Sequence, residues 1–171
     1  MKPETSARTR DVICLGRAAV DLYGRQVGGR LEDMASFRKY LGGSSANLAA
    51  GLARLGRSSA MLTRVGDEQM GRFVREALRR EGVDVSRVRT DPDRLTALVI
   101  LGIGPGNATP HIFYRERCAD MGITEEDVDE AFIASARMLS ITGTHLSTPS
   151  TRAAVRKAIA LARAHGTEVV L

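Results

Sequence analysis

A glycine pair followed by a helix of small residues is the feature that most constrains the fold of this chain. Gly42 and Gly43 let the backbone turn tightly and approach a neighbouring group where a Cβ would otherwise stand. The stretch 44–55 predicts a helix with three leucines on one apolar stripe, and Gly56 follows as its stop. The free N–H groups at such a helix start suit hydroxyls, carboxylates or phosphates, so the pattern predicts a small-molecule site.

This glycine-rich turn is a weak signal when it stands alone. Its glycines are equally explained by close packing of a strand on a helix, and Asn47 by a hydrogen bond to its own helix terminus. No Gly-Lys-Ser/Thr follows at the spacing of a Walker loop, which excludes that class of nucleotide site here.

Apolar runs alternate with amphipathic segments along the rest of the chain, which predicts an α/β fold. The spacer 104–107 separates two runs that predict a hairpin. The expected core strands are 12–15, 58–65, 138–142 and one opening at 167–171, and the expected strands outside the core are 37–41, 95–103 and 111–115. The expected helices lie after a cap at Asp67 up to Gly82, from Thr124 to about Ala136, and from Ser147 to Gly166.

Asp21 follows the first core strand, and we expect it just beyond the carboxyl end of that strand. Ligands gather there in open α/β sheets. A lone aspartate at such a place is also explained as a turn former or a helix cap.

Several motifs together resemble the ribokinase-like (PfkB) family of sugar kinases. The resemblance rests on Gly42-Gly43, Asn47, Ala49, Leu55-Gly56 and Val65-Gly66-Asp67, and it extends over 11–23, 113–121 and 141–145. It implies a mainly parallel sheet flanked by helices, with a small β lid over the sugar formed by segments about 22–41 and 95–117. The lid and sheet would be incomplete in this chain.

The resemblance implies transfer of the γ-phosphoryl group of ATP, with Mg²⁺, to a primary hydroxyl of a sugar acid. Within the family, these segments are most similar in sequence to the kinases that act on 5-dehydro-2-deoxygluconate in inositol breakdown. A 2-keto-3-deoxygluconate kinase, a fructokinase and a noncatalytic sugar-binding module remain alternatives.

Four of the implied substrate-binding residues belong to the segments already described. The resemblance assigns Asp21 to accept hydrogen bonds from substrate hydroxyls, which a fixed carboxylate suits. It assigns Gly42, Gly43 and Asn47 to bind hydroxyls through backbone and amide groups.

Tyr114 and Arg115 complete the implied substrate site. Related kinases of keto-sugar acids carry a similar pair, and a guanidinium matches a carboxylate bidentately, so we expect Arg115 to bind the substrate carboxylate. Successive strand residues point to opposite faces, so Tyr114 and Arg115 share a face only if the strand bends. The alternative is a solvated arginine paired with Glu116 or Asp120.

Other polar residues are weaker candidates. Arg17 and Arg117 are further cations for the same anion. His145 follows a predicted strand near the expected site, but a lone histidine is more often structural, and we place it outside the site.

Length limits how much of such a kinase this chain can hold. Kinases of the family are roughly twice as long as its 171 residues, which predicts an amino-terminal portion. The family's general base and phosphate cradle belong to a later Asp-Thr-x-Gly-Ala-Gly-Asp motif that is missing here. We therefore assign no catalytic residue in this chain and expect no kinase activity from it alone.

Composition narrows the classes of partner. A content of 43% hydrophobic and 26% charged residues is typical of a soluble globular protein. The net charge of +5 comes from scattered arginines without interleaved aromatics, which argues against nucleic-acid binding. No apolar run reaches membrane-spanning length, and two distant cysteines favour the reduced cytoplasm. We expect residues 1–10 to form a flexible tail, and exposed lid edges to pair in a homodimer.

Overall fold

A parallel five-stranded sheet forms the centre of the molecule, in a computed structural model that describes residues 8–104 and 108–171. The expected tail at 1–7 and the spacer residues 105–107 lie outside the described residues. The strand order is β5-β4-β1-β8-β9 and every pairing is parallel. These strands are β1 Arg10–Leu15, β4 Ser59–Gly66, β5 Asp84–Asp91, β8 Ala136–Ile141 and β9 Glu168–Val170.

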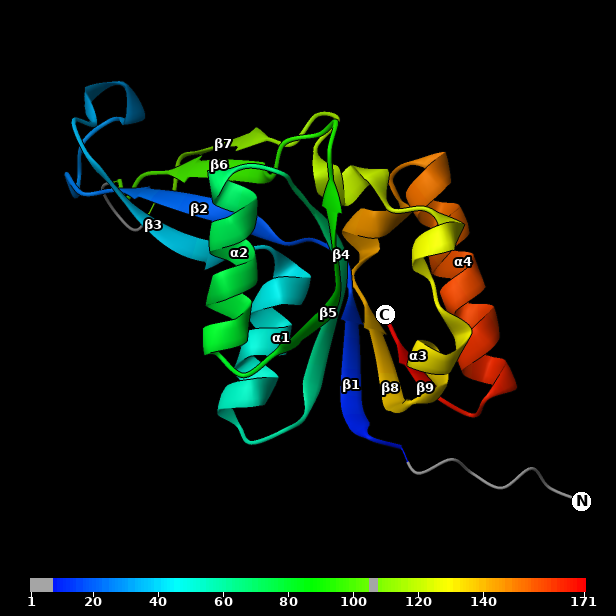
Figure 1. Cartoon of the computed structure of the whole chain (residues 1–171). Helices are drawn as coiled ribbons and strands as arrows, with labels where there is room; N and C mark the ends of the chain where they lie inside the picture. Colours follow the sequence, from blue (N-terminus) through cyan, green and yellow to red (C-terminus); the bar gives the residue numbers. More distant parts are fainter. Residues whose placement is uncertain (1–7, 105–107) are drawn as a thin grey trace, which may run out of the picture.

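Helices cover both faces of this sheet (Figure 1). On one face lie α1 Ser44–Arg54 and α2 Gln69–Arg80, and on the other lie α3 Glu130–Ala134 and α4 Pro149–Ala164. Successive side chains of β1 point to opposite faces of the sheet, so β1 contributes to the hydrophobic core on each face. Ile13 packs with the α3 and α4 side chains, and Cys14 packs with those of α1 and α2. The near-continuous apolar run of β1 is thus explained by burial on both faces.

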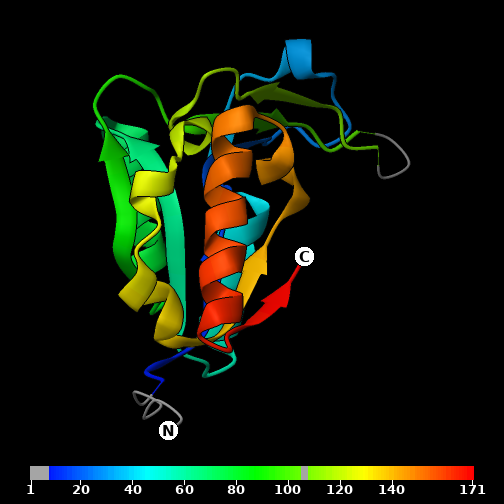
Figure 2. The ribbon, with the colours of Figure 1, turned by 90° about the vertical axis from the view of Figure 1, so that its right-hand side faces the viewer.

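A second sheet of four strands, which we call the lid, projects from one end of the core (Figures 1 and 2). Its order is β3-β2-β6-β7, where β2 runs parallel to β6 and the two outer pairings are antiparallel. The strands are β2 Ala19–Gly24, β3 Phe37–Gly42, β6 Ala97–Leu101 and β7 His111–Tyr114. The pairing of β6 with β7 confirms the expected hairpin, and the two sheets confirm the expected ribokinase-like α/β architecture.

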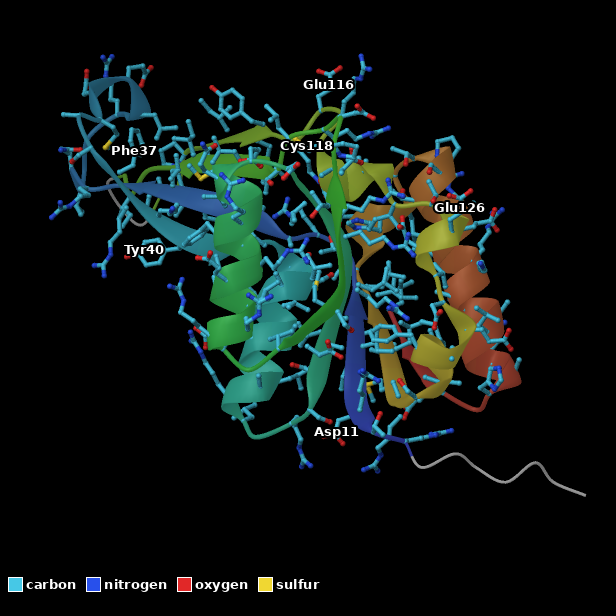
Figure 3. All side chains as sticks on the ribbon, viewed as in Figure 1. Asp11, Phe37, Tyr40, Glu116, Cys118 and Glu126 are labelled. Carbon is cyan, nitrogen blue, oxygen red and sulfur yellow. The ribbon has the colours of Figure 1, made fainter. Side chains whose placement is uncertain are left out.

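The side chains of the lid lie far from the start of β1. Figure 3 shows Phe37 and Tyr40 on the lid at one end of the molecule and Asp11 at the other. A short 3₁₀ turn, η1 Leu31–Asp33, connects β2 to β3 at the outer end of the lid.

Two strands differ from the sequence expectation. The lid begins at Ala19 rather than near residue 22, so Asp21 lies inside β2 and not in a loop after β1. β5 was not expected because four of its eight residues are charged, and it forms the edge strand, where one side remains open to water. A strand in which half of the residues are charged carries too weak an apolar alternation to be recognised.

Two helix starts also differ. The cap of α2 is Glu68, whose carboxylate accepts hydrogen bonds from the N–H groups of Met70 and Gly71, rather than Asp67. Thr124 forms the expected capping box, but the box closes only the 3₁₀ turn η4 Glu125–Asp127, and α3 starts later with Asp129 as its cap.

The fully buried residues of α1 are small, and of the three leucines expected on its apolar stripe only Leu52 packs, partly buried, against the core. Ser45, Ala46, Ala49 and Ala50 face the core, whereas Leu48 is 41% exposed. The expected leucine stripe is therefore not what fixes the helix to the sheet. Alanine packing brings the α1 backbone close to β1 and β4 instead.

At the amino-terminal end of the described chain, Arg8 already belongs to the folded structure. Its guanidinium donates to the backbone oxygens of His165 and Gly166, at 3.2 and 2.6 Å. β1 starts at Arg10, so the core begins slightly before the expected end of the tail. In the part of the chain that the structure describes, no helix combines the length and the apolar character needed to cross a membrane.

Candidate functional site

The glycine pair joins β3 to α1 at the point where the lid meets the core. Both glycines are buried, and Gly43 has a φ of +97°, which favours glycine. A Cβ on Gly43 would come within 2.5 Å of the backbone oxygen of Arg17. That oxygen instead accepts a hydrogen bond of 3.2 Å from the N–H of Ala46. The pair thus holds the start of α1 against the link between β1 and β2.

Asp21 depends on Gly42 for its position. The Asp21 carboxylate lies across Gly42, in space that a Cβ on this glycine would occupy. Its Oδ1 is buried and has no hydrogen-bond partner among the described residues. Burial raises the pKa of Asp21, and the nearby Arg17 acts in the opposite direction. An acceptor held in this way is suited to hydroxyl donors of a ligand.

The strand register separates the two faces of the lid. Asp21 pairs with Tyr40 on β3 and with Val99 on β6, and Val99 pairs with Phe113 on β7. Directly paired residues share a face, so these four form one row that includes the Asp21 carboxylate. We call the surface containing this row the Asp21 face.

Tyr114 lies on the opposite face of the lid. It pairs with Leu98, which pairs with Val20, and both of these pack toward the α1 and α2 core. The structure therefore does not bring Tyr114 together with Asp21. Its neighbours across a different cavity include Glu68 and Met70 at the start of α2.

A cavity of about 520 Å³ opens beside the Asp21 face. Asn47 lies in the first turn of α1, is exposed and lines this cavity together with Asp21. Aromatic side chains of β2 and β3 form another part of its wall. The lining of this cavity includes Asp21, Tyr23, Tyr40, Asn47 and Ile103.

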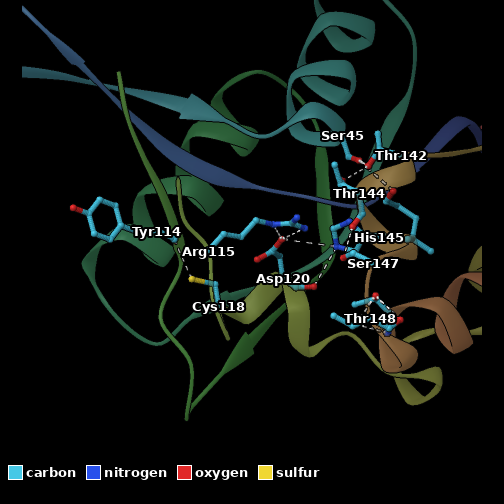
Figure 4. A network of polar contacts seen from close by, with 12 residues as sticks. Ser45, Tyr114, Arg115, Cys118, Asp120, Thr142, Thr144, His145, Ser147 and Thr148 are labelled. Atoms are coloured by element: carbon cyan, nitrogen blue, oxygen red, sulfur yellow. Dashed lines mark hydrogen bonds and ion pairs between the residues drawn. The ribbon is translucent and has the colours of Figure 1, made fainter. Parts of the chain in front are cut away.

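Arg115 is held by a buried carboxylate (Figure 4). Its Nε and one terminal nitrogen donate to Asp120 Oδ2 at 3.0 and 2.8 Å. The Asp120 side chain is fully buried in η3, Ala119–Gly122, and the Arg115 side chain is 18% exposed. Arg115 is therefore neither the solvated surface arginine of the alternative reading nor a guanidinium free of protein contacts.

His145 lies on the other side of Asp120 (Figure 4). It belongs to η5, Gly143–Leu146, is fully buried, and its Nε2 is 3.2 Å from the backbone oxygen of Asp120. Burial lowers the pKa of His145 below its ordinary value of 6.5, while Asp120 acts in the opposite direction. A neutral imidazole fits its packed position, in keeping with the structural role expected from the sequence.

Hydroxyl groups tie the start of α1 to the end of β8 (Figure 4). Ser45 Oγ lies 3.0 Å from Thr142 Oγ1 and donates to the backbone oxygen of Leu15 at 3.2 Å. A Cβ on Gly16 would overlap Ser45 Oγ, so this contact requires glycine at that position. These contacts therefore join the carboxyl ends of β1 and β8 to the start of α1.

Arg17 is influenced by three charged groups of the site. Burial and the charge of Arg115 lower the pKa of Arg17, while the carboxylates of Asp120 and Asp21 act in the opposite direction. Its guanidinium lies over the Phe113 ring, 5.3 Å from the centroid. From the sequence Arg17 was only a secondary candidate, because its contact with Phe113 depends on tertiary structure.

Metal-binding residues were not expected in this chain, and we assign none. Across residues 8–104 and 108–171, no three His, Cys, Asp or Glu side chains gather closely enough to hold a metal ion.

Comparison with known proteins places this site in a family. The chain is 38% identical over 169 residues to the 5-dehydro-2-deoxygluconokinase of Geobacillus kaustophilus, covering 98% of this chain and 50% of the relative. It thus spans about half the length of the curated relatives it matches.

Two solved structures resemble the whole described fold. The PfkB protein from Polaromonas sp. JS666 is 35% identical with a TM-score of 0.87, over 94% of this chain and 54% of that one. An uncharacterised sugar kinase of Pyrococcus horikoshii in complex with ATP is 25% identical with a TM-score of 0.84, over 92% and 51%. The sequence pattern of the pfkB family carbohydrate kinases matches residues 9–171. This chain therefore belongs to the pfkB family of carbohydrate kinases.

Proposed function

We propose that this chain forms the sugar-binding part of an ATP-dependent kinase that acts on 5-dehydro-2-deoxygluconate. The observation that carries the proposal is the Asp21 carboxylate, which lies across Gly42 with one buried oxygen unpartnered among the described residues. The relative from Geobacillus kaustophilus, named for this substrate, supports the same choice of sugar.

In the proposed complex, each part of the site binds a different group of the sugar. Asp21 accepts hydrogen bonds from hydroxyls, and the side-chain amide of Asn47 both donates and accepts. Gly42 and Gly43 let the sugar approach the backbone closely. Tyr114 is not included, because it lies on the opposite face of the lid. Arg115 was predicted to bind the substrate carboxylate directly. Its ion pair with Asp120 argues against that prediction.

ATP and Mg²⁺ belong to the proposal as the phosphoryl donor and its metal ion. The Pyrococcus horikoshii structure with ATP supports this choice. We assign neither of them to residues of this chain, and we propose that the chain alone does not transfer phosphate.

A homodimer through the lid is a further part of the proposal. Aromatic and aliphatic side chains of the lid are exposed on β3 and β7, which are its outer strands. Open strand edges that carry apolar side chains favour pairing with a second copy. Analytical ultracentrifugation of the 171-residue chain tests this, and a monomer at all concentrations would contradict it. The side chains concerned are Phe37, Tyr40, Ile112, Phe113 and Tyr114.

Calorimetric titration of the 171-residue chain with 5-dehydro-2-deoxygluconate tests the sugar site. We expect binding without ATP, and a loss of roughly 10- to 100-fold in affinity for Asp21→Asn, because hydrogen bonds to a charged acceptor contribute about 1.5–3 kcal/mol. Asp93→Asn is the matched control, since Asp93 is exposed and does not line the cavity of the Asp21 face.

A phosphorylation assay with ATP then compares the sugar acid, 2-keto-3-deoxygluconate and fructose, using this chain and any longer product of the same reading frame. Preference for fructose would favour a fructokinase. Binding without phosphorylation in every form would favour the noncatalytic sugar-binding module.

A further inference from the structure

We infer that Arg17 is the side chain that binds the carboxylate of the sugar acid, while Arg115 holds Asp120 in place. This inference rests on the proposed function, because it names the group that distinguishes a sugar acid from a neutral sugar. It assigns substrate recognition to the link between β1 and β2, next to Asp21, rather than to the end of β7.

The first step of the argument is that Arg115 is already occupied. Two of its nitrogens donate to the same oxygen of Asp120, whose side chain is fully buried. Turning Arg115 toward a ligand would leave this carboxylate without its cation in the protein interior, which is strongly unfavourable. A ligand carboxylate could reach only the remaining N–H groups of Arg115, whose positive charge is already compensated by Asp120.

The second step is that the guanidinium of Arg17 has unused hydrogen-bond donors. Its Nε is buried, and no hydrogen bond or ion pair of its guanidinium occurs within residues 8–104 and 108–171. Buried polar groups in folded proteins are nearly always paired, so an unpaired guanidinium nitrogen indicates a partner that the chain itself does not supply. An anion with two oxygens fits the planar fork of arginine.

The third step is that Arg17 lies on the correct face. Its guanidinium contacts the ring of Phe113, which belongs to the same row as Asp21 on the Asp21 face. Stacking on this ring orients the fork and limits the rotamers that must be fixed on binding. A sugar that donates hydroxyls to Asp21 can therefore present its carboxylate to Arg17.

The fourth step concerns the charge of the surroundings. Three ionised groups influence Arg17: Arg115, Asp120 and Asp21. The charges of Arg115 and Asp120 oppose each other. Asp21 would face the hydroxyl groups of the proposed sugar and not its carboxylate. The partly buried setting reduces screening by water, so an arriving carboxylate is attracted more strongly than at an exposed arginine. The transferred phosphoryl group is another anion that would suit Arg17, and the experiment separates the two.

The test measures binding of three ligands to the 171-residue chain by calorimetry: 5-dehydro-2-deoxygluconate, fructose and inorganic phosphate. Arg17→Gln should weaken the sugar acid by roughly 10- to 100-fold, as expected for loss of a charge-assisted bidentate contact, and should leave fructose unchanged. Arg17→Lys should fall between the two, because lysine keeps the charge but lacks the fork. Arg57→Gln is the matched control, since Arg57 is exposed in the turn between α1 and β4.

Three outcomes would overturn the inference. An equal loss for the sugar acid and fructose would give Arg17 a structural role, while the proposed sugar site would stand. A larger effect on phosphate than on the sugar acid would assign Arg17 to the phosphoryl group. Wild-type protein that binds the sugar acid no better than fructose would overturn both the inference and the proposed substrate. Circular dichroism of each variant confirms that the affinities refer to folded protein.

Discussion

The carboxylate of Asp21 and the α-carbon of Gly42 are packed so closely that no side chain fits between them. Gly42 follows Leu41 at the end of β3 and pairs with Ala19, two residues before Asp21 on the neighbouring strand. The glycine is therefore required by its neighbour rather than by its own backbone angles, since Gly42 is not among the residues with positive φ.

Gly42→Ala is expected to displace the Asp21 carboxylate and to weaken sugar binding by roughly 10-fold or more, because a fixed acceptor is lost. Calorimetric titration with the sugar acid measures this. Gly51→Ala is the matched control, because Gly51 lies within α1 and a Cβ there meets nothing within 4 Å. This control should raise stability by about 0.5–1 kcal/mol. Unchanged affinity in Gly42→Ala would show that Asp21 does not act from the observed position.

Asp21→Asn is expected to stabilise the ligand-free protein at pH 7 while it weakens sugar binding. Burial raises the pKa of Asp21, so the folded state disfavours the ionised carboxylate and loses stability as the pH rises through this raised value. The gain should be below about 1 kcal/mol, because the side chain is partly open to water. It should vanish below the ordinary pKa of 3.8, where the carboxyl is protonated in both states.

Urea unfolding across this pH range gives the comparison. Asp33→Asn should have the opposite sign, because a hydrogen bond from Arg30 lowers the pKa of Asp33 and its ionised form therefore favours folding at neutral pH. The same sign for both variants would mean that the surroundings of Asp21 do not disfavour its charge.

Arg115→Leu is expected to destabilise the fold by about 3–5 kcal/mol, because it leaves the buried Asp120 carboxylate without its cation. The free energy of unfolding measures the loss. Arg54→Leu removes the exposed ion pair with Glu81 and should change the free energy of unfolding little, because water screens this pair. If Arg115→Leu were as mild as this control, Arg115 would be free to act on a ligand instead.

Glu68→Ala is expected to cost about 1–2 kcal/mol, because it removes the cap of α2. The same carboxylate accepts hydrogen bonds from Thr96, through its backbone N–H at 3.1 Å and through its hydroxyl, just before β6 begins. Glu68 thus connects a core helix to the base of the lid. Asp67→Ala should have little effect on the melting temperature, because Asp67 is exposed and is not the cap. Equal effects would restore the cap predicted from sequence.

Local signals predicted the parts of the fold that depend on neighbouring residues. Thr148 followed by Pro149 predicted the start of α4, and Thr148 does accept the hydrogen bond from the N–H of Thr151. The glycine pair predicted a close approach of two backbone segments, and Gly43 does lie close to the backbone of Arg17.

Features that depend on distant residues were not accessible in the same way. Four of the eight residues of β5 are charged, and Arg87, Arg89 and Asp91 form ion pairs with residues distant in the sequence, so its pattern resembles that of a loop. Asp120 looked like one of two neighbouring carboxylates for Arg115, and its full burial depends on packing of η3 against β4. The sequence does not show that Asp120 pairs with Arg115 and not with Arg17, so the unpaired guanidinium of Arg17 could not be predicted.

The parallel pairing of β2 with β6 has a consequence for how the protein reaches its fold. Between these two neighbours the chain passes through β3, α1, β4, α2 and β5, so the lid closes over a long loop that already contains much of the core. Closing such a loop is entropically costly until its own contacts have formed. We therefore expect β2 and β6 to gain protection from hydrogen exchange after β1 and β4 during refolding. The Asp21 face would then form late, and a partly folded chain would not present it.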